Sequence, residues 1–342
     1  MHINDRIKSF ARLGETLRDA IAGNDLRYSE HLNLLINAQQ IHNQWFTPGN
    51  VKLAITSIAQ ELTTENLSKW TSSYQGPGKN EKPLRVGVIM AGNIPLVGFH
   101  DFLSVLISGN ILVAKTSSKD SELIKYIADI LCNISTDFKD FIKFTDTTLT
   151  GFDVVIATGS NNSSRYFEYY FGKYPHIIRK NRNSVAIITG DESADELTSL
   201  GKDIFSYFGL GCRNVSKVWI PRGYELNGLV ANWGSYGDLI CHSGYANNYD
   251  FNKAVYIVNR EKFHDTGYLL LRENTSLASP VSVLHFEYYD SEKTVMQQTG
   301  MLSEMIQCIV GKKHLPFGTA QNPHLWDYAD GIDTLDFLQK NK

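Results

Sequence analysis

Apolar residues near the start of the chain recur every three or four positions, which is the spacing of one face of a helix. This spacing predicts a helix over residues 3–21 whose buried face is formed by Ile3, Ile7, Phe10, Leu13, Leu17 and Ile21. A second helix is predicted from Pro48 with Thr47 as its N-cap, because proline is favoured at the first helical position. Thr64 is expected to cap a short third helix. The pattern therefore predicts a helical segment over residues 1–75.

A stretch rich in glycine and proline at residues 76–83 ends this pattern and is the clearest linker in the chain. After it, short apolar runs alternate with helical stretches. The predicted strands are 86–90, 111–115, 154–158, 185–188, 215–220, 254–258 and 281–286. The predicted helices are 95–108, 121–133, 165–171 and one that ends near Phe208. Strands that alternate with helices imply right-handed crossovers and a parallel sheet, so the predicted fold class is α/β.

Charge and composition exclude several kinds of protein. The 342 residues include 33 Lys+Arg and 36 Asp+Glu, a formal net charge of −3 without a basic block, which argues against a nucleic-acid partner. No apolar run approaches the roughly 20 residues of a membrane helix. The N-terminus lacks the apolar stretch of a signal peptide, so we expect a cytoplasmic protein. No metal site is expected, because these four cysteines lack metal-type spacing: Cys132, Cys212, Cys241 and Cys308.

Three junctions between strands and helices carry more polar and glycine residues than packing requires. They are residues 90–95, 158–162 and 209–214. Ligands of open α/β sheets bind at the carboxyl ends of strands, and a Gly-Ser turn into a helix offers backbone N–H groups to a phosphate. Each junction also has a plainer interpretation, since Asn93 can cap a helix and Cys212 can be an inert buried thiol. The glycines beside Cys212 and the charge of Arg213 favour a reactive thiolate instead.

The order of these junctions resembles the aldehyde dehydrogenase superfamily. There an Asn-x-Pro motif, a Gly-Asn-x-x-Val-x-Lys strand, a Thr-Gly-Ser turn and a nucleophilic cysteine follow one another. The matching residues here are Asn93 with Pro95, Gly109 to Lys115, Thr158-Gly159-Ser160 and Gly211-Cys212. Within the superfamily the chain looks most like acyl-CoA reductases of the LuxC type. That likeness rests on Gly92-Asn93-Ile94-Pro95, Gly211-Cys212-Arg213 and residues 317–321, and the resemblance runs from about Arg85 to the C-terminus.

This resemblance implies an aldehyde dehydrogenase-like fold of two three-layer α/β domains after an N-terminal helical segment. A nucleotide-binding domain is expected over residues 84–190, completed by 312–342, with the helices of residues 1–75 packed against it. The catalytic domain that carries the cysteine is expected over residues 191–311. The resemblance also implies a homo-oligomer and allows an acyl-transferring partner protein, although no segment marks such an interface.

The roles of individual residues follow from the same resemblance. Cys212 matches the nucleophile that forms a thioester with the acyl group. Asn93 matches the donor that stabilises the oxyanion together with the Cys212 backbone N–H, a contribution on the order of 3–4 kcal/mol of barrier. NAD-preferring relatives carry a ribose-binding glutamate three residues after the matched lysine, where this chain has Ser118. A glutamate would repel a 2′-phosphate, so NADPH is the expected cofactor and NADH the alternative, unless Ser118 is simply a polar turn residue. The expected cofactor contacts are Lys115, Ser118, Thr158, Gly159 and Ser160.

Two family glutamates are missing. The one that activates water for thioester hydrolysis would fall at residues 179–183, which read Arg-Lys-Asn-Arg-Asn, so coenzyme A is expected as the leaving group. The one that holds the nicotinamide ribose would fall at residues 275–280, with Glu273 only nearby. The predicted activity is NAD(P)H-dependent reduction of an acyl-CoA to an aldehyde through an acyl-cysteine. Two alternatives stay open: a CoA-acylating dehydrogenase of a short aldehyde, and a non-catalytic nucleotide- or acyl-binding protein. His100 and His242 are each either a proton shuttle for the cysteine or a structural histidine.

Overall fold

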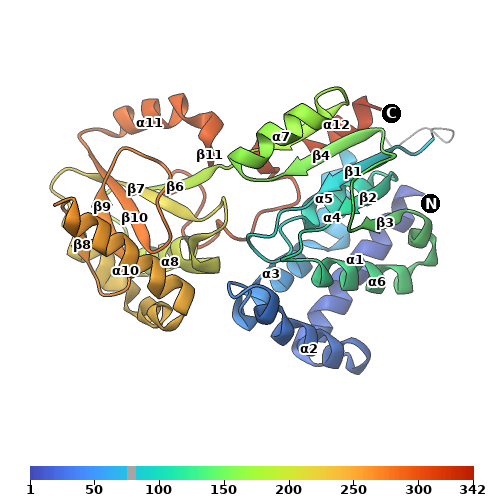
Figure 1. The fold of residues 1–342 in the computed structure, drawn as a ribbon, viewed down its shortest axis with the longest axis horizontal. Coiled ribbons are helices and arrows are strands. Elements are labelled where there is room, and N and C mark those ends of the chain that lie inside the picture. Colours follow the sequence, from blue (N-terminus) through green and yellow to red (C-terminus); the bar gives the residue numbers. More distant parts are fainter. Residues whose placement is uncertain (75–81) are drawn as a thin grey trace. The chain divides into compact units, whose positions relative to one another are not determined.

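The computed structural model describes residues 1–74 and 82–342, so the expected linker at residues 76–83 falls almost entirely outside the described part. The chain forms two compact units, drawn as ribbons in Figure 1. The first unit comprises Met1–Asn181 with His324–Lys342, and the second comprises Arg182–Pro323.

Four helices open the first unit. They are α1 (Ile3–Ala22), α2 (Leu26–His42), α3 (Pro48–Glu61) and α4 (Thr64–Ser72). The predicted cap of α3 is confirmed, because the Thr47 side chain accepts a hydrogen bond from the Asn50 backbone N–H at 3.3 Å. The predicted cap of α4 is wrong by one residue. Thr63 caps this helix, since its hydroxyl accepts from the Asn66 backbone N–H at 3.1 Å.

A five-stranded parallel sheet follows in the order β3-β2-β1-β4-β5. Its strands are β1 (Arg85–Ile89), β2 (Ile111–Lys115), β3 (Ile142–Thr145), β4 (Val154–Thr158) and β5 (His176–Arg179). Its helices are α5 (Phe99–Ile107), α6 (Glu122–Ile134), α7 (Asn161–Phe171) and α12 (Thr334–Lys340). Because the strands are parallel, the carboxyl ends of β2, β1 and β4 lie next to one another at one edge of the sheet.

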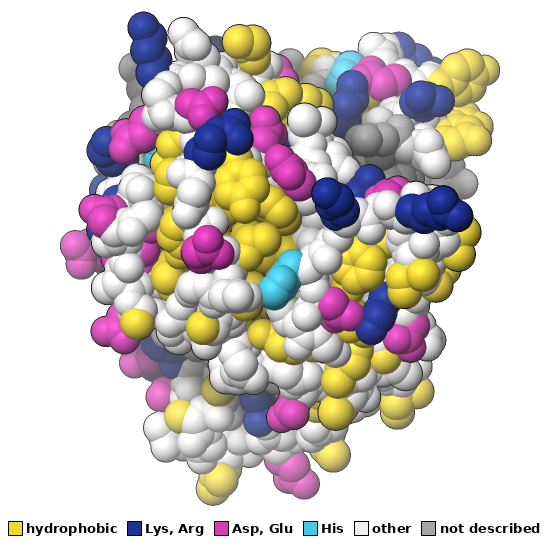
Figure 2. Space-filling view, turned by 90° about the vertical axis from the view of Figure 1, so that its left-hand side faces the viewer, with side chains coloured by type: hydrophobic (Ala, Val, Ile, Leu, Met, Phe, Trp, Pro, Cys, Tyr) yellow, Lys and Arg dark blue, Asp and Glu magenta, His cyan; other side chains and the backbone are white. Residues whose placement is uncertain are grey.

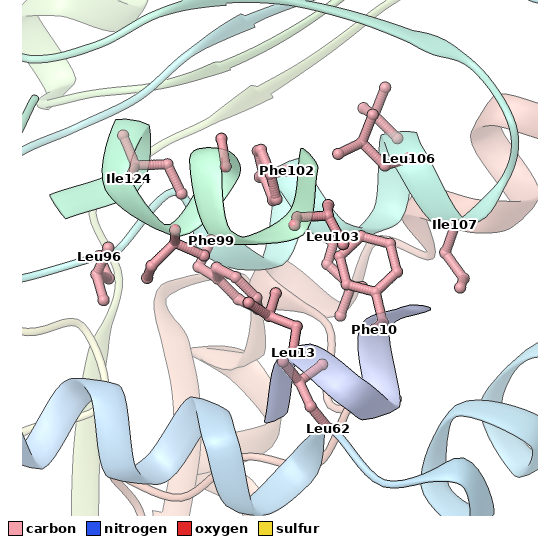
Figure 3. Close-up of a cluster of buried hydrophobic side chains, with 14 of the residues drawn as sticks. Phe10, Leu13, Leu62, Leu96, Phe99, Phe102, Leu103, Leu106, Ile107 and Ile124 are labelled. Carbon is pink, nitrogen blue, oxygen red and sulfur yellow. The ribbon is translucent and has the colours of Figure 1, made fainter. Parts of the chain in front are cut away.

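The sheet buries both of its faces. Leu112 and Ala114 of β2 point into a large core with α5, α6, α12 and the N-terminal helices, whereas Val113 points to the other face beside Phe171 of α7. Figure 3 shows part of the large core, where Phe10 and Leu13 of α1 lie close to α5. The N-terminal helices are thus part of the same hydrophobic core as the sheet.

The second unit contains a six-stranded sheet in the order β11-β6-β7-β10-β9-β8. Its strands are β6 (Asn183–Ile187), β7 (Val215–Pro221), β8 (His264–Asp265), β9 (Leu270–Glu273), β10 (Val283–Tyr289) and β11 (Ile306–Val310). They are parallel except for the short antiparallel pair of β8 and β9. Its helices are α8 (Ala194–Phe205), α9 (Leu226–Val230), α10 (Ser243–Val258) and α11 (Glu292–Met301).

The border between the two units differs from the expected one. We expected the first domain to run to residue 190, but it ends at Asn181, because the next strand, β6, pairs with β7 and β11 of the second sheet. For the same reason the returning segment joins the first unit at His324 and not at residue 312.

Two predicted elements are wrong. Residues 254–258 are not a strand but the last turns of α10, whose Tyr245, Tyr249 and Tyr256 are buried at helical spacing while Val258 is 80% exposed. The helix predicted from residue 95 begins at Phe99. It starts late because Leu96 has a φ of 58°, a left-handed conformation that an α-helix does not contain.

The surface carries charges of both signs. On the face drawn in Figure 2, Lys and Arg side chains are interspersed with Asp and Glu side chains, in line with the net charge of −3. Within residues 1–74 and 82–342, no helix has the length and apolar character required to cross a membrane.

Candidate active site

Asn93 is an exposed residue of the turn at the carboxyl end of β1. We call residues 90–98 the Asn93 turn. Its first residue is tied to the neighbouring strand, since the Met90 backbone N–H donates to the Lys115 carbonyl oxygen at 3.0 Å. Gly92 passes so close to the next turn that an added Cβ would lie 2.4 Å from the Ser117 hydroxyl oxygen. The glycine of the Gly-Asn-x-Pro motif is therefore required by close packing.

Lys115 and Ser118 lie at the carboxyl end of β2, in a segment that we call the Ser118 turn (residues 115–121). Lys115 ends the strand and is half-buried, and Ser118 is exposed. A short bridge closes the turn, in which the Asp120 backbone N–H donates to the Ser117 carbonyl oxygen at 3.1 Å. The Asn93 turn and the Ser118 turn thus lie side by side.

Thr158, Gly159 and Ser160 connect the carboxyl end of β4 to α7. Ser160 is the N-cap of α7, and its hydroxyl accepts from the Ser163 backbone N–H at 3.2 Å. An added Cβ on Gly159 would lie 2.8 Å from the Phe167 ring and 2.9 Å from Ser163, so strand and helix approach closely here. This turn presents the N-terminus of an 11-residue helix beside β1, at the point where the strand order reverses direction. Such a switch point is where nucleotides bind on doubly wound sheets.

Cys212 lies in the second unit, on a half-buried loop between α8 and β7. Three successive residues before it are left-handed: Tyr207 (φ 53°), Phe208 (φ 57°) and Gly209 (φ 78°). For the two aromatic residues this conformation costs on the order of 1–3 kcal/mol each and persists only where surrounding contacts enforce it. The loop that carries the thiol is therefore held in a strained shape.

Asn214 supplies many of those contacts. It is 2% exposed, and its side-chain oxygen accepts from the Gly211 backbone N–H at 2.8 Å. Its side-chain nitrogen lies 2.8 Å from the Ser206 carbonyl oxygen, with the carbonyl oxygens of Asp203 and Ile204 at 3.1 and 3.3 Å. One buried amide thus spans the loop from the end of α8 to the residue before Cys212.

Ser184 fixes the backbone of Cys212 from the neighbouring strand. Its hydroxyl donates to the Cys212 carbonyl oxygen at 2.9 Å, and it lies 3.0 Å from the Cys308 thiol and accepts from the Cys308 backbone N–H at 3.2 Å. Ser184 of β6 therefore fixes the orientation of the Cys212 carbonyl group.

The motif at residues 317–321 lies beside the same loop. The Asp203 carboxylate accepts from the Gly318 and Ala320 backbone N–H groups at 2.6 and 2.9 Å, and the Arg213 guanidinium donates to the Ala320 carbonyl oxygen at 3.5 Å. Burial raises the pKa of Asp203 to about 6, against the effect of its two backbone donors. The tail motif and the cysteine loop are thus joined through α8.

The positions of the two missing glutamates are filled by structural contacts. At the first, Arg179 is buried and pairs with Asp101 at 2.7 Å. At the second, the Thr275 carbonyl oxygen accepts from the Lys217 ammonium at 2.8 Å, and Lys217 in turn pairs with Glu287 at 2.5 Å. Burial lowers the pKa of Lys217, while Glu287 opposes that shift.

Both candidate histidines have structural partners. His100 contacts the Leu325 carbonyl oxygen at 2.8 Å, within the first unit. The Nδ1 of His242 accepts from the Tyr245 backbone N–H at 3.2 Å and thereby caps α10. The His242 ring also packs 4.4 Å from that of Phe208, so it lies next to the strained loop before Cys212.

Several residues that shape these loops gave no signal in the sequence. Ser184, Asp203 and Asp120 are buried polar residues whose hydrogen-bond partners lie far along the chain, which local patterns do not reveal. Asn214 lies within the junction at residues 209–214, but the pattern did not show that its side chain holds the loop. The signal that could have drawn attention to Asp120 is its position two residues after Ser118.

Comparison with known proteins decides the family. The family model "Acyl-CoA reductase (LuxC)" matches residues 27–227, which include Asn93, Lys115, the turn at residues 158–160 and Cys212. This chain belongs to the LuxC acyl-CoA reductase family. The match begins upstream of the resemblance drawn from the motifs, within α2, and ends before the tail motif at residues 317–321. A search of curated proteins found no match.

Solved structures agree on the fold. An aldehyde dehydrogenase from Bacillus cereus with NAD+ is 14% identical, with a TM-score of 0.62 over 91% of this chain and 72% of that one. A NAD-dependent benzaldehyde dehydrogenase from Corynebacterium glutamicum is 13% identical, with a TM-score of 0.64 over 91% and 76%. The predicted aldehyde dehydrogenase-like α/β fold is therefore confirmed.

Membership in the LuxC acyl-CoA reductase family makes the chain an oxidoreductase of acyl and aldehyde groups. Together with the fold, it supports reduction of an acyl-CoA with a nicotinamide cofactor over the two alternatives, the short-aldehyde dehydrogenase and the non-catalytic binding protein.

Proposed function

We propose that this LuxC-family reductase converts an acyl-CoA to an aldehyde through a thioester on Cys212. The observation that carries the proposal is the family match, because it spans Asn93, Lys115, the turn at residues 158–160 and Cys212 in their expected order. Asn93 and the expected cofactor contacts belong to the first unit, and Cys212 belongs to the second.

In the first half-reaction the Cys212 thiolate attacks the thioester carbon of the acyl-CoA. A tetrahedral oxyanion forms, the bond to the coenzyme A sulfur breaks, and coenzyme A leaves as its thiolate. The Asn93 amide and the Cys212 backbone N–H donate hydrogen bonds to the oxyanion, which exists only in the transition state and intermediate. The bond from Ser184 to the Cys212 carbonyl supports this role, since it fixes the orientation of the cysteine backbone.

The residues of the first unit fit a nicotinamide dinucleotide. The α7 N-terminus at Ser160 offers backbone N–H groups to the pyrophosphate, and the close approach at Gly159 leaves room for no larger residue. Lys115 and Ser118 lie at the neighbouring strand end, where they would contact the adenosine ribose. When bound, the reduced cofactor supplies the hydride that turns the thioester into an aldehyde. The Cys212 thiolate is released in that step.

The end product depends on whether the chain has a carboxylate that activates water to hydrolyse the thioester. Hydrolysis of the thioester to a free acid needs a carboxylate that activates water. Arg179 occupies the matching region, and its guanidinium is committed to Asp101. We therefore infer that the acyl group leaves as an aldehyde and that coenzyme A, not water, is its partner in the reverse direction.

We also propose a preference for NADPH over NADH. Ser118 is exposed on its turn and is flanked in sequence by the exposed Lys119, so a 2′-phosphate would meet a hydroxyl and a positive charge there. Steady-state kinetics with both cofactors tests this preference. A kcat/KM for NADH equal to or above that for NADPH contradicts it.

A panel of acyl-CoA thioesters of increasing chain length tests the function as a whole. With NADPH or NADH present, we expect loss of the absorbance of the reduced nicotinamide, together with equal amounts of aldehyde and free coenzyme A. Activity only from aldehyde, NADP+ and coenzyme A would favour the acylating dehydrogenase. Binding without turnover in either direction would favour the non-catalytic protein.

A further inference from the structure

A buried carboxylate links the two turns that carry the proposed acyl and cofactor contacts of the first unit. Asp120 is 4% exposed, and its Oδ2 accepts from the Leu96 backbone N–H at 2.7 Å. Within residues 1–74 and 82–342, its Oδ1 is buried and makes no hydrogen bond. A buried carboxylate without a cationic partner is costly, so we expect this one to have a structural role.

The residue that Asp120 holds is itself strained. Leu96 adopts a φ of 58°, and its side chain is 4% exposed and belongs to the large hydrophobic core. Figure 3 labels Leu96 among the side chains of this core. A branched residue in this conformation relaxes unless its surroundings hold it there. The core anchors the Leu96 side chain, and Asp120 anchors its backbone.

Leu96 in turn sets the start of α5. The Phe99 backbone N–H donates to the Leu96 carbonyl oxygen at 2.9 Å, and the N-cap, Gly98, offers no side chain to cap the helix. Asp120 thus fixes the backbone between Asn93 and this helix through the bond that it accepts from Leu96.

Three contacts join the Asn93 turn to the Ser118 turn. They are the Met90–Lys115 backbone bond, the close approach of Gly92 to Ser117, and the Leu96–Asp120 bond. Asn93 lies between the second and third contacts on its own turn. Ser118 lies between Ser117 and Asp120 on the other. A shift at Asp120 therefore moves both residues relative to each other.

We propose that Asp120 is a positioning residue that fixes the Asn93 turn against the Ser118 turn, so that the oxyanion donor and the ribose contact keep one spacing. This inference rests on the proposed function, because it takes Asn93 and Ser118 in the roles assigned above. Asp120 touches neither substrate nor cofactor in this proposal and acts through Leu96.

The chemistry of the site suggests a conservative replacement. Burial raises the pKa of Asp120 to about 7, although its bond from Leu96 lowers it. An asparagine has nearly the same shape as the protonated carboxyl group, which burial favours. The Asp120→Asn amide oxygen can accept from the Leu96 N–H, whereas Asp120→Ala removes the acceptor. Asp120→Ser places its hydroxyl one bond short of Leu96 and serves as a second variant should the alanine variant not fold.

The test measures thioester formation on the enzyme with acyl-CoA and no nicotinamide. Asp120→Ala and Asp120→Ser should slow acylation by about 10-fold or more, since displacement of a positioned group by about 1 Å can cost 10²-fold. Asp120→Asn should stay within about 3-fold of the wild type. The matched control is Asp153→Ala, which removes a carboxylate that accepts from the Arg85 backbone N–H at 2.7 Å, at the opposite end of β1. It should acylate as the wild type.

A double-mutant cycle distinguishes positioning from a general structural effect. If Asp120 acts through Asn93, then Asp120→Ala adds almost nothing to acylation in an Asn93→Ala background, because groups that act as a unit are not additive. If the double variant instead loses acylation rate by the product of the two single losses, the proposal is overturned. An Asp120→Asn variant that acylates as slowly as Asp120→Ala also overturns it.

Hydrogen exchange over residues 90–99 tests the role of Asp120 without measuring enzyme activity. Exchange there should be faster in Asp120→Ala than in Asp120→Asn or Asp153→Ala, and equal rates in the three variants overturn the proposal. A wild-type enzyme that forms no thioester at all would instead contradict the proposed function, and the exchange arm would still decide the role of Asp120.

Discussion

Replacement of Asn214 by alanine should loosen the loop that carries Cys212. The side chain accepts one bond from the Gly211 N–H and donates toward three carbonyl oxygens at 2.8–3.3 Å. An amide has only two N–H groups, so about three hydrogen bonds are made at once. At roughly 0.5–1.5 kcal/mol net for each, Asn214→Ala should lower the free energy of opening the loop by about 2–4 kcal/mol.

The variant Asn214→Asp tests whether the bonds or only the volume matters. Aspartate has the same size and keeps the acceptor for Gly211, but it places a carboxylate against carbonyl oxygens that need a donor. At pH 8 we therefore expect Asn214→Asp to be at least as damaging as Asn214→Ala. A role in filling space alone would leave the aspartate variant nearly as stable as the wild type.

Hydrogen exchange followed by mass spectrometry measures this opening locally. Peptides within residues 203–215 should exchange about 100-fold faster in Asn214→Ala, since each 1.4 kcal/mol corresponds to a factor of ten. Peptides from β1 and β2, in the other unit, serve as the internal control and should be unchanged. Wild-type exchange over residues 203–215 in the alanine variant would refute the view that Asn214 holds the loop.

Three further predictions concern activity, cofactor choice and pH. Asn93→Ala should lower the acylation rate by about 10²-fold with little change in NADPH affinity; loss of NADPH binding with normal acylation would show that Asn93 merely shapes the cofactor turn. Ser118→Glu should weaken NADPH binding by roughly 1–3 kcal/mol, and unchanged affinity would place the 2′-phosphate elsewhere. Burial raises the pKa of Asp203 from its ordinary value of 3.8 to about 6. The folded state then binds this proton more tightly than the unfolded chain, so the free energy of unfolding should fall as the pH rises from about 4 to about 6. Asp203→Asn should remove this fall, on the order of 3 kcal/mol; an unchanged pH slope in denaturant titrations would contradict the assignment.

The centre of the first sheet could be predicted from the sequence because its strands are buried on both faces. Such strands are almost continuous apolar runs, as in β1, β2 and β4, and their ends place Asn93, Lys115 and Ser160 at one edge. Short strands at the sheet edges gave no comparable signal. β3 and β5 have four residues each, and only half or fewer of these are buried.

The hydrophobic pattern gave a wrong prediction at residues 254–258, because a short apolar run fits a strand and a helix equally well. The run at residues 254–258 is apolar enough for a strand, but the buried face of α10 is made by tyrosines, and the aliphatic Ile257 and Val258 face outward. The loop-shaping residues were missed for a different reason. Asp120 and Asp203 look like surface residues in sequence, and only their long-range backbone partners reveal that they are buried.

The central claim is that Cys212 carries the acyl group, and peptide mapping by mass spectrometry tests it directly. The full chain is incubated with a long-chain acyl-CoA without nicotinamide, digested and mapped. The proposal predicts one added acyl group, labile to hydroxylamine, on the peptide that contains Cys212, and its loss as aldehyde when NADPH is added. Cys212→Ala should take up none, whereas Cys241→Ala, which lacks the exposed thiol, should behave as the wild type. An acyl group on Cys241 or Cys308, or a Cys212→Ala variant that still turns over, would contradict the account.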